Sequence, residues 1–377
     1  MAKKKICICH LVYSFDVGGL ERIIVNCINN LKSDNFCHVI VSLTKIGDFY
    51  SEIDIPIECF SLNKKEGNDI AVYFKLYKLL NKLHPDVIHT YNLGTIEYQW
   101  VAWLARVPQR IHAEHGRDSY DPNGTVKKYR WLRRLSSHVI HHMVAVSADL
   151  HQWLIDEVGV PQNKVSLIIN GVDTQHYVKS TSDAQHHLPF CHNKCVFGHV
   201  ARLHQIKNQP FLLEAFRDAC EKNRDFAQDS VLLIVGDGPD KTQLEGFVRG
   251  DYWLKERVFF TGSKTEVIDY YKEFDVFLMS SFAEGIPMTL IESMSMSIPH
   301  LVTKVGGIGE VIIDNETGLA VASGDHDGYV NGLIKLYSSQ QLRETMGQKA
   351  RQQIEQNFSQ RDMVAAYQAL YLERQAQ

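Results

Sequence analysis

The chain has 377 residues, of which 45% are hydrophobic and 22% are charged, a balance typical of an ordinary soluble globular protein. Its formal net charge of -4 gives no reason to expect nucleic-acid binding, and no run of about twenty apolar residues that would span a membrane occurs. A chain of this length exceeds a typical single core, so we expect two domains.

The first apolar run, residues 6–12, follows three lysines and therefore resembles the start of a secretion signal. His10, Ser14 and Asp16 soon follow, however, and no small-residue cleavage site is present. We therefore interpret this run as a first buried strand.

The cysteines show neither paired spacing nor metal-ligand spacing, since Cys191 and Cys195 lack a second Cys or His pair. We interpret all of them as reduced thiols of a cytosolic protein. The remaining ones are Cys7, Cys9, Cys27, Cys37, Cys59 and Cys220.

Apolar runs of strand length alternate with helical patterns through the first half of the chain. This alternation predicts a parallel sheet covered on both faces. The strands are predicted at 6–12, 38–42, 86–89, 110–113, 143–147 and 164–169, and the helices from Leu20 and at 69–83, 95–105 and 149–157.

Two features of this half follow predicted strands. Gly18 and Gly19 either allow a tight turn or let a ligand's phosphate or sugar approach the backbone, but no third glycine completes a dinucleotide fingerprint. His115 directly follows the strand at 110–113, where sheets of this kind bind ligands, although a structural histidine is the alternative.

Residues 125–142 are basic and aromatic, which is typical of a solvated helix face. The alternative is a helix that lies on an anionic membrane leaflet. The cations are Lys127, Lys128, Arg130, Arg133 and Arg134, and they alternate with Tyr129, Trp131, Leu132 and Leu135.

Residues 178–193 lack periodicity and are interpreted as a linker, after which a second alternating series begins. Arg202 and Lys207 follow its first strand, where two cations can clamp a diphosphate or can simply face solvent. The strands are predicted at 195–200, from 231, from 258, at 275–279 and at 299–303, and the helices at 210–222, 325–338, 340–357 and 360–373.

The stretch 281–293 places Glu284 before a predicted helix and Glu292 inside it. Pro287 suits the first turn of that helix, and Gly285 permits close approach of a ligand. The N–H groups of Ile286, Met288 and Thr289 would then form a helix N-terminus suited to an anion such as a diphosphate. The alternative is an ordinary helix entry with an N-terminal acid.

With these residues in hand, the chain resembles a retaining glycosyltransferase of the GT-B fold, family 4. It resembles more narrowly bacterial sugar transferases of exopolysaccharide and PEP-CTERM gene clusters. The resemblance implies an α/β fold with two doubly wound Rossmann-like domains facing a central cleft. The matching motifs, in order, are Gly18-Gly19-Leu20-Glu21, Glu114-His115-Gly116, Val146-Ser147, Asn170-Gly171-Val172-Asp173, Arg202 with Lys207, Gly236-Asp237-Gly238, Glu284 with Glu292, and Gly306-Gly307 before Glu310.

The implied domains are an acceptor-side domain at 1–177, a linker at 178–193, a nucleotide-sugar donor domain at 194–357, and a C-terminal helix at 358–377 that packs back on the first domain. The resemblance also implies a cytoplasmic location, or a peripheral one at the inner face of the plasma membrane. There the basic segment 127–134 would contact anionic lipid.

The resemblance also implies roles for single residues. Arg202 and Lys207 would hold the donor diphosphate, Glu284 would contact the transferred sugar, and Glu292 would accept hydrogen bonds from the ribose. His115 would face the sugar from the other domain. Further donor contacts would come from Gly18, Gly19, Gly236, Gly238, Ser263, Gly285, Ile286, Pro287, Met288 and Thr289.

The implied reaction transfers a hexose from a UDP- or GDP-linked donor to a glycan or lipid-linked acceptor with retention, and the leaving phosphate takes the acceptor's proton. No cofactor and no metal are expected, because no Asp-x-Asp follows a predicted strand and Lys or Arg can stabilise the leaving phosphate. Ile286 stands where many relatives carry an aromatic residue, which leaves the donor sugar open. Two alternatives are a nucleotide-sugar-binding regulatory subunit without catalysis and a GT-B nucleotide-sugar epimerase.

Overall fold

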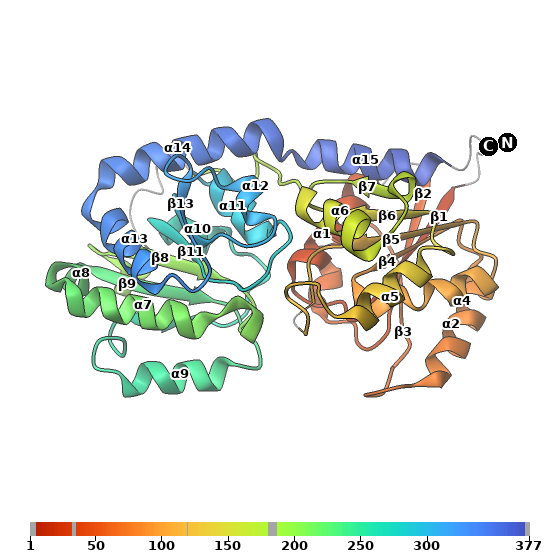
Figure 1. The fold of residues 1–377 in the computed structure, drawn as a ribbon, viewed down its shortest axis with the longest axis horizontal. Helices are drawn as coiled ribbons and strands as arrows, with labels where there is room; N and C mark the ends of the chain where they lie inside the picture. Colours follow the sequence, from red (N-terminus) through yellow and green to blue (C-terminus); the bar gives the residue numbers. More distant parts are fainter. Residues whose placement is uncertain (1–4, 32–34, 119, 180–186, 374–377) are drawn as a thin grey trace. The chain divides into compact units, whose positions relative to one another are not determined.

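The computed structural model describes residues 5–31, 35–118, 120–179 and 187–373 (Figure 1). The chain forms two compact units: unit 1 comprises 1–170 and 360–377, and unit 2 comprises 171–359. Each unit contains a parallel sheet with helices packed on it, so the structure has the predicted α/β class and two domains.

Unit 1 is built on seven parallel strands in the order β3-β2-β1-β4-β5-β6-β7. β3 was not predicted, because this edge strand is only partly buried and has no continuous apolar run. The strands are β1 Ile6–Val12, β2 Phe36–Ser42, β3 Glu58–Ser61, β4 Val87–Tyr91, β5 Gln109–Glu114, β6 His142–Ala145 and β7 Val165–Leu167. The helices are α1 Gly19–Asn30, α2 Ile70–Leu83, α3 Leu93–Ile96, α4 Gln99–Leu104, α5 Lys127–Ser136, α6 Ala148–Trp153 and α15 Gln360–Leu372.

Unit 2 is built on six parallel strands in the order β10-β9-β8-β11-β12-β13. The strands are β8 Cys195–Val200, β9 Ser230–Val235, β10 Val258–Phe260, β11 Val276–Met279, β12 His300–Thr303 and β13 Gly318–Val321. The helices are α7 Gln209–Lys222, α8 Arg224–Asp229, α9 Lys241–Gly250, α10 Ile268–Glu273, α11 Met288–Ser295, α12 Ile308–Val311, α13 His326–Ser338 and α14 Gln340–Asn357.

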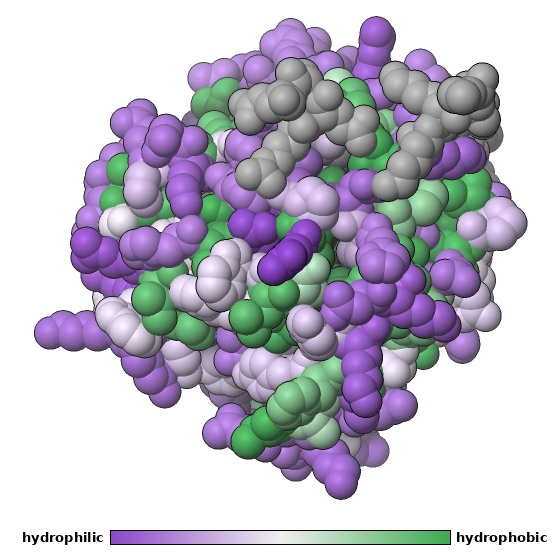
Figure 2. Space-filling view, turned by 90° about the vertical axis from the view of Figure 1, so that its right-hand side faces the viewer, coloured by the Kyte–Doolittle hydropathy of each residue, from purple (hydrophilic) through white to green (hydrophobic). Residues whose placement is uncertain are grey.

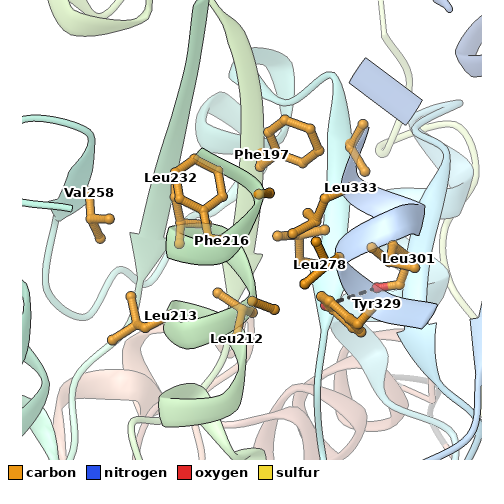
Figure 3. Close-up of a cluster of buried hydrophobic side chains, with 14 of the residues drawn as sticks. Phe197, Leu212, Leu213, Phe216, Leu232, Val258, Leu278, Leu301, Tyr329 and Leu333 are labelled. Carbon is orange, nitrogen blue, oxygen red and sulfur yellow. Dashed lines mark hydrogen bonds between the residues drawn. The ribbon is translucent and has the colours of Figure 1, made fainter. Parts of the chain in front are cut away.

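The main core of unit 2 lies where α7 and α13 pack on the sheet (Figure 3). Phe216 of α7 contacts the ring of Phe197 on β8, and Tyr329 of α13 donates a hydrogen bond to the carbonyl oxygen of Leu301 on β12 at 3.3 Å. The strands are continuous apolar runs because helices cover both faces of a parallel sheet. This packing fixes the strand ends from which the loops of the candidate site emerge.

In both sheets the chain order reverses beside the first strand of the unit, between β1 and β4 and between β8 and β11. Ligands of open parallel sheets bind outside the carboxyl ends of the strands at such a reversal. A ligand site is therefore expected at the loops after β1, β4, β8 and β11.

The division between the two units falls after Asn170, whereas the sequence predicted it after residue 177. Val172 pairs with Ser359, and the carbonyl oxygen of Tyr177 accepts a hydrogen bond from the Ser295 hydroxyl at 2.8 Å, so these residues are tied to unit 2. Residues 180–186 of the predicted linker lie outside the described residues. Most of the predicted C-terminal helix is α15, and it belongs to unit 1.

All eight cysteines are free thiols. Of the helices within the described ranges, none combines the length and the apolar character that crossing a bilayer requires.

α15 closes over a chain of buried histidine and tyrosine side chains in unit 1. His10 bonds His38 at 3.0 Å and the Tyr91 hydroxyl at 2.7 Å, and His89 bonds the Tyr371 hydroxyl of α15 at 2.8 Å. Burial lowers the pKa of His38 to about 4 and also lowers the pKa of His10 and His89, which the charges of neighbouring histidines lower further. The three rings are therefore neutral near pH 7.

We expect the thermal midpoint of unfolding to decrease as the pH is lowered from 6.5 to about 4. In the unfolded chain the imidazoles bind protons below about pH 6.5, whereas the folded chain holds these three neutral. The unfolded state then binds more protons, so stability decreases as the pH decreases. Unfolding curves at several pH values should become less pH-dependent in His38→Gln but not in His138→Gln, whose histidine is exposed. Equal slopes in both variants would contradict this assignment.

Candidate donor site and the histidine loop

The predicted site residues of unit 2 lie in loops and in one helix that follow the carboxyl ends of its strands. Arg202 and Lys207 follow β8, Gly236 and Gly238 follow β9, and Ser263 follows β10. Glu284 to Thr289 lead from β11 into α11, which carries Glu292. The sheet therefore gathers residues from four separate segments at one edge, because carboxyl ends of parallel strands share an edge.

Lys207 and Glu284 form an ion pair across the reversal between β8 and β11. The Lys207 ammonium lies 2.6 Å from Oε1 of Glu284, and the hydroxyl of Ser281 donates to the same oxygen at 2.5 Å. The side chains are 23% and 8% exposed, so the pair is largely shielded but still reachable from solvent. The hydroxyl of Ser280 holds the Lys207 carbonyl at 2.9 Å. Two residues that the sequence assigned to diphosphate and sugar are thus adjacent.

Arg202 is exposed, and among the described residues its guanidinium has no hydrogen-bond or ion-pair partner. Its backbone is fixed, because the Gln209 amide donates to its carbonyl oxygen at 3.0 Å. The structure thus presents an exposed guanidinium on a loop whose backbone is held. Sequence reasoning did not identify Gln209 as its anchor.

The Gly236 loop packs directly against the Arg202 loop. Gly236 has φ 146°, and a Cβ there would lie 1.9 Å from the carbonyl oxygen of Ala201. A Cβ at Gly238 would lie 2.1 Å from the carbonyl oxygen of Leu203. These glycines are therefore required for the two loops to meet, which is a structural reason for them beside the predicted contact with the donor base.

Pro287 is the N-cap of α11 and precedes the helix, whereas the sequence placed it in the first turn. Met288 and Thr289 are the first two helical residues, and N–H groups at such positions have no acceptor within their own helix. Gly285 and Ile286 belong to a buried segment, and Ile286 is only 2% exposed. The helix N-terminus itself is present as expected.

Glu292 is buried on α11 and accepts a hydrogen bond from the Tyr271 hydroxyl at 2.8 Å. Tyr271 lies on α10 and was not identified from the sequence, since nothing in its local pattern distinguishes it from a core tyrosine. Gly306, at φ 49°, passes so close to Glu284 that a Cβ would lie 2.0 Å from that residue's carbonyl oxygen. The loop after β12 thus packs closely against the backbone of Glu284.

His115, Gly18 and Gly19 belong to unit 1. Gly18 is the extended N-cap of α1 and Gly19 is its first residue. His115 follows β5, and its backbone N–H donates to the Asn92 side chain at 2.8 Å. Both ring nitrogens are buried without a hydrogen-bond partner within the described ranges. Burial lowers the pKa of His115 to about 3, although the charge of Glu114 opposes this, so the ring is neutral at pH 7.

Beside His115 lies a buried ion pair that the sequence did not predict. Arg133 of α5 donates to both carboxylate oxygens of Glu114, at 2.6 and 3.1 Å, and to Asp118 at 2.8 Å. Burial by itself would raise the pKa of Glu114, but the charge of Arg133 and hydrogen bonds from His112 and Arg133 hold it at about 2. This network fixes the segment on either side of His115.

The sequence pattern of the basic segment 127–134 suggested a solvated helix face. In the structure the segment is only partly exposed to solvent. Arg133 is only 1% exposed, and Arg130 pairs with Glu157 at 2.8 Å. Lys127, Lys128 and Arg134 remain exposed. Of the predicted surface cations, Arg133 thus forms a buried ion pair inside unit 1, and Arg130 forms an ion pair with a neighbouring helix.

The two parallel sheets with their helices form the two-domain α/β arrangement of the GT-B fold. The overall structure resembles that of Anabaena HepE in complex with UDP and glucose, with a TM-score of 0.80 and 19% sequence identity over 97% of this chain and 99% of that chain.

The family model described as Glycosyltransferase Family 4 matches residues 17–176, and that described as Glycosyl transferases group 1 matches residues 182–353. The chain belongs to the family 4 glycosyltransferases.

Two relatives of known assignment cover most of the chain. The Escherichia coli UDP-Gal:alpha-D-GlcNAc-diphosphoundecaprenol alpha-1,3-galactosyltransferase is 27% identical and covers 94% of each chain. The Staphylococcus aureus capsular polysaccharide biosynthesis glycosyltransferase CapM is 22% identical and covers 78% of each chain.

Proposed function

We propose that this protein transfers a hexose from a nucleotide diphosphate sugar to a lipid-linked glycan, with retention of anomeric configuration, in the synthesis of an exopolysaccharide or another cell-surface polysaccharide. The observation that carries the proposal is the shielded Lys207–Glu284 pair beside the Arg202 loop at the reversal of the unit 2 sheet. The Escherichia coli relative, which is named for a diphosphoundecaprenol-linked acceptor, supports the lipid-linked acceptor, and the Staphylococcus aureus relative, which is named for capsular polysaccharide biosynthesis, supports the role in a surface polysaccharide.

In this proposal, Lys207, Arg202 and the N-terminus of α11 receive the donor diphosphate. Positive charge at the leaving phosphate is worth most where it is already in place before negative charge develops. The Lys207 ammonium is held in place by Glu284, whereas only the backbone of Arg202 is held, by Gln209, and its guanidinium is exposed toward solvent.

Glu284 would accept hydrogen bonds from hydroxyls of the transferred sugar, and Glu292 from the ribose. A carboxylate can accept several hydrogen bonds, so the bonds from Ser281 and Lys207 to Glu284, and from Tyr271 to Glu292, do not by themselves use its full acceptor capacity. His115, uncharged at pH 7, would donate to or accept from a sugar hydroxyl without adding charge at the reacting carbon.

The chemistry we propose is attack by the acceptor hydroxyl on the same face of the sugar from which the phosphate leaves. The bond from the anomeric carbon to the phosphate oxygen breaks, the bond to the acceptor oxygen forms, and the leaving phosphate takes the acceptor's proton. Neither a metal nor a cofactor is assigned a role, because Lys207, Arg202 and the α11 N–H groups supply the stabilisation of the phosphate.

We place the protein in the cytoplasm, with peripheral contact at the inner face of the membrane. Lys127, Lys128 and Arg134, the exposed cations of α5, would take part in that contact. The donor nucleotide is proposed to be UDP, with GDP as the other candidate, because the Escherichia coli relative is named for a UDP-linked donor.

A panel of UDP- and GDP-sugars is expected to identify one that raises the thermal midpoint of the protein. A ligand present at about 100 times its Kd stabilises the folded state by about 2.7 kcal/mol. The shift should disappear in Arg202→Ala and persist in Arg249→Ala, whose arginine is exposed on α9 of the same unit.

If no nucleotide sugar changes the midpoint at millimolar concentration, the donor assignment is wrong. If a donor binds but no acceptor yields product, the regulatory subunit is favoured. Conversion of the donor without any acceptor favours the epimerase.

A further inference from the structure

The outer face of α2 is apolar although it faces solvent. Ile70, Phe74 and Tyr77 are 70%, 66% and 42% exposed and recur at one-turn spacing along the helix. The opposite face carries Val72, Leu76 and Leu80, which are buried in the core of unit 1. The helix is therefore packed by one apolar face and presents a second one outward, so core packing does not account for the second.

α4 continues this apolar surface. Trp103 is 49% exposed and Leu104 is 61% exposed at the end of that helix. Figure 1 shows α2 and α4 side by side, and the rings of Tyr73 and Tyr98 stack between them at 4.9 Å. We call Ile70, Phe74, Tyr77, Trp103 and Leu104 the α2–α4 surface. Figure 2 views this end of the molecule and shows apolar side chains standing among hydrophilic ones.

The charges on these two helices have one sign. α2 contains Lys75, Lys78 and Lys82, Arg106 follows α4, and neither helix contains an acidic residue. Lys75 is engaged, because its ammonium donates to the carbonyl oxygen of Leu62 at 2.8 Å. The others are exposed. The surface therefore combines exposed aromatic and aliphatic groups with uncompensated positive charge.

Three other long helices lack this combination, whereas the shorter α5 carries a smaller version of it, with Trp131 64% and Leu135 36% exposed among its cations. α7, α13 and α14 of unit 2 carry no exposed large hydrophobic residue, although all three are fully described and each faces solvent on one side. Of the acids beside these helices, Asp69 caps α2 and Glu97 interacts with the Tyr73 hydroxyl. Both are committed to the protein itself.

We propose that the α2–α4 surface lies on an anionic lipid bilayer and is the main membrane contact of the protein. This rests on the lipid-linked acceptor of the proposed function. Aromatic and aliphatic side chains insert at the boundary between headgroups and acyl chains, while lysines meet anionic headgroups. A second copy of the chain is a poorer occupant, because a symmetric pairing would bring the same lysines face to face.

The test uses the full chain and two kinds of vesicle, phosphatidylglycerol mixed equally with phosphatidylcholine, and phosphatidylcholine alone. The wild type is expected to sediment with the anionic vesicles at low salt. Phe74→Ser combined with Trp103→Ser, and separately Lys78→Glu combined with Lys82→Glu, should each reduce the bound fraction at least tenfold. Lys127→Glu combined with Lys128→Glu is the comparison variant: its cations on α5 take a smaller part in the contact, so it should lose less.

Each variant must keep the wild-type thermal midpoint and the nucleotide-sugar shift, which separates a failure here from a failure of the proposed donor site. The proposal is overturned if the wild type stays in the supernatant, if both α2–α4 variants bind like the wild type, or if only the α5 variant loses binding. Concentration-dependent self-association that Phe74→Ser with Trp103→Ser abolishes, without vesicle binding, would assign the surface to a second copy.

Discussion

Changing Glu284 or Lys207 to alanine is expected to lower kcat/KM by roughly 10²- to 10³-fold while the protein stays folded. Removing one preorganised group that stabilises charge in a transition state has an effect of that size. Each change also removes the partner that orients the other residue, because the two side chains lie 2.6 Å apart. The rate is measured with the donor identified by the thermal shift and a lipid-linked glycan acceptor.

The double variant should lose less than the sum of the two single losses, since residues in direct contact are not energetically independent. The matched control is Asp269→Ala, which breaks an exposed ion pair with Lys272 at 2.8 Å on α10 of the same unit. That variant should have nearly normal turnover. Normal turnover in both Glu284→Ala and Lys207→Ala would contradict the proposed reaction and its site.

Changing Arg133 to methionine is expected to destabilise the folded state by about 3–5 kcal/mol. Removing one partner of a buried ion pair leaves an uncompensated charge, here the carboxylate of Glu114, which is fully buried. Methionine retains much of the side-chain volume, so the loss reports mainly on charge and on the lost contact of the guanidinium with the Trp153 ring. Chemical denaturation measures the free energy of unfolding.

Arg134 provides the neighbouring control, because it lies on the same helix and is exposed. Arg134→Met should change the free energy of unfolding by no more than about 0.5 kcal/mol. If both variants unfold at the same denaturant concentration, the buried network does not stabilise unit 1. Should Arg133→Met not fold at all, Glu114→Gln, which removes one of the two carboxylates that pair with Arg133 and leaves Asp118, still tests the pair.

The strand positions followed from local pattern. Strands such as Ile6–Val12 and Cys195–Val200 were predicted at their observed bounds, because central strands of a covered parallel sheet are continuous apolar runs. Glu58–Ser61 was missed, since an edge strand that is partly exposed has no such run. The helix from Gln360 to Leu372 was visible by its period.

The candidate site was predicted as separate residues. That Lys207 and Glu284 follow two strands was readable from the chain, but their contact was not, because the order of β8 and β11 in the sheet is set by chain crossovers. Tyr271 and Gln209 were missed for a related reason, since each acts through a neighbour from a different element.

The sequence by itself determined the class of fold, the family and the residues of the candidate donor site, since periodicity and short motifs are local properties of a chain. Only the tertiary structure decided which polar groups meet and which side of a helix is buried. Arg133 shows this most clearly: it stands in a basic run that resembles a solvated face, yet its guanidinium lies inside unit 1 against Glu114. α2 shows the converse, because its apolar residues supply both the core and an outer surface, and the partition between them depends on what packs against the helix.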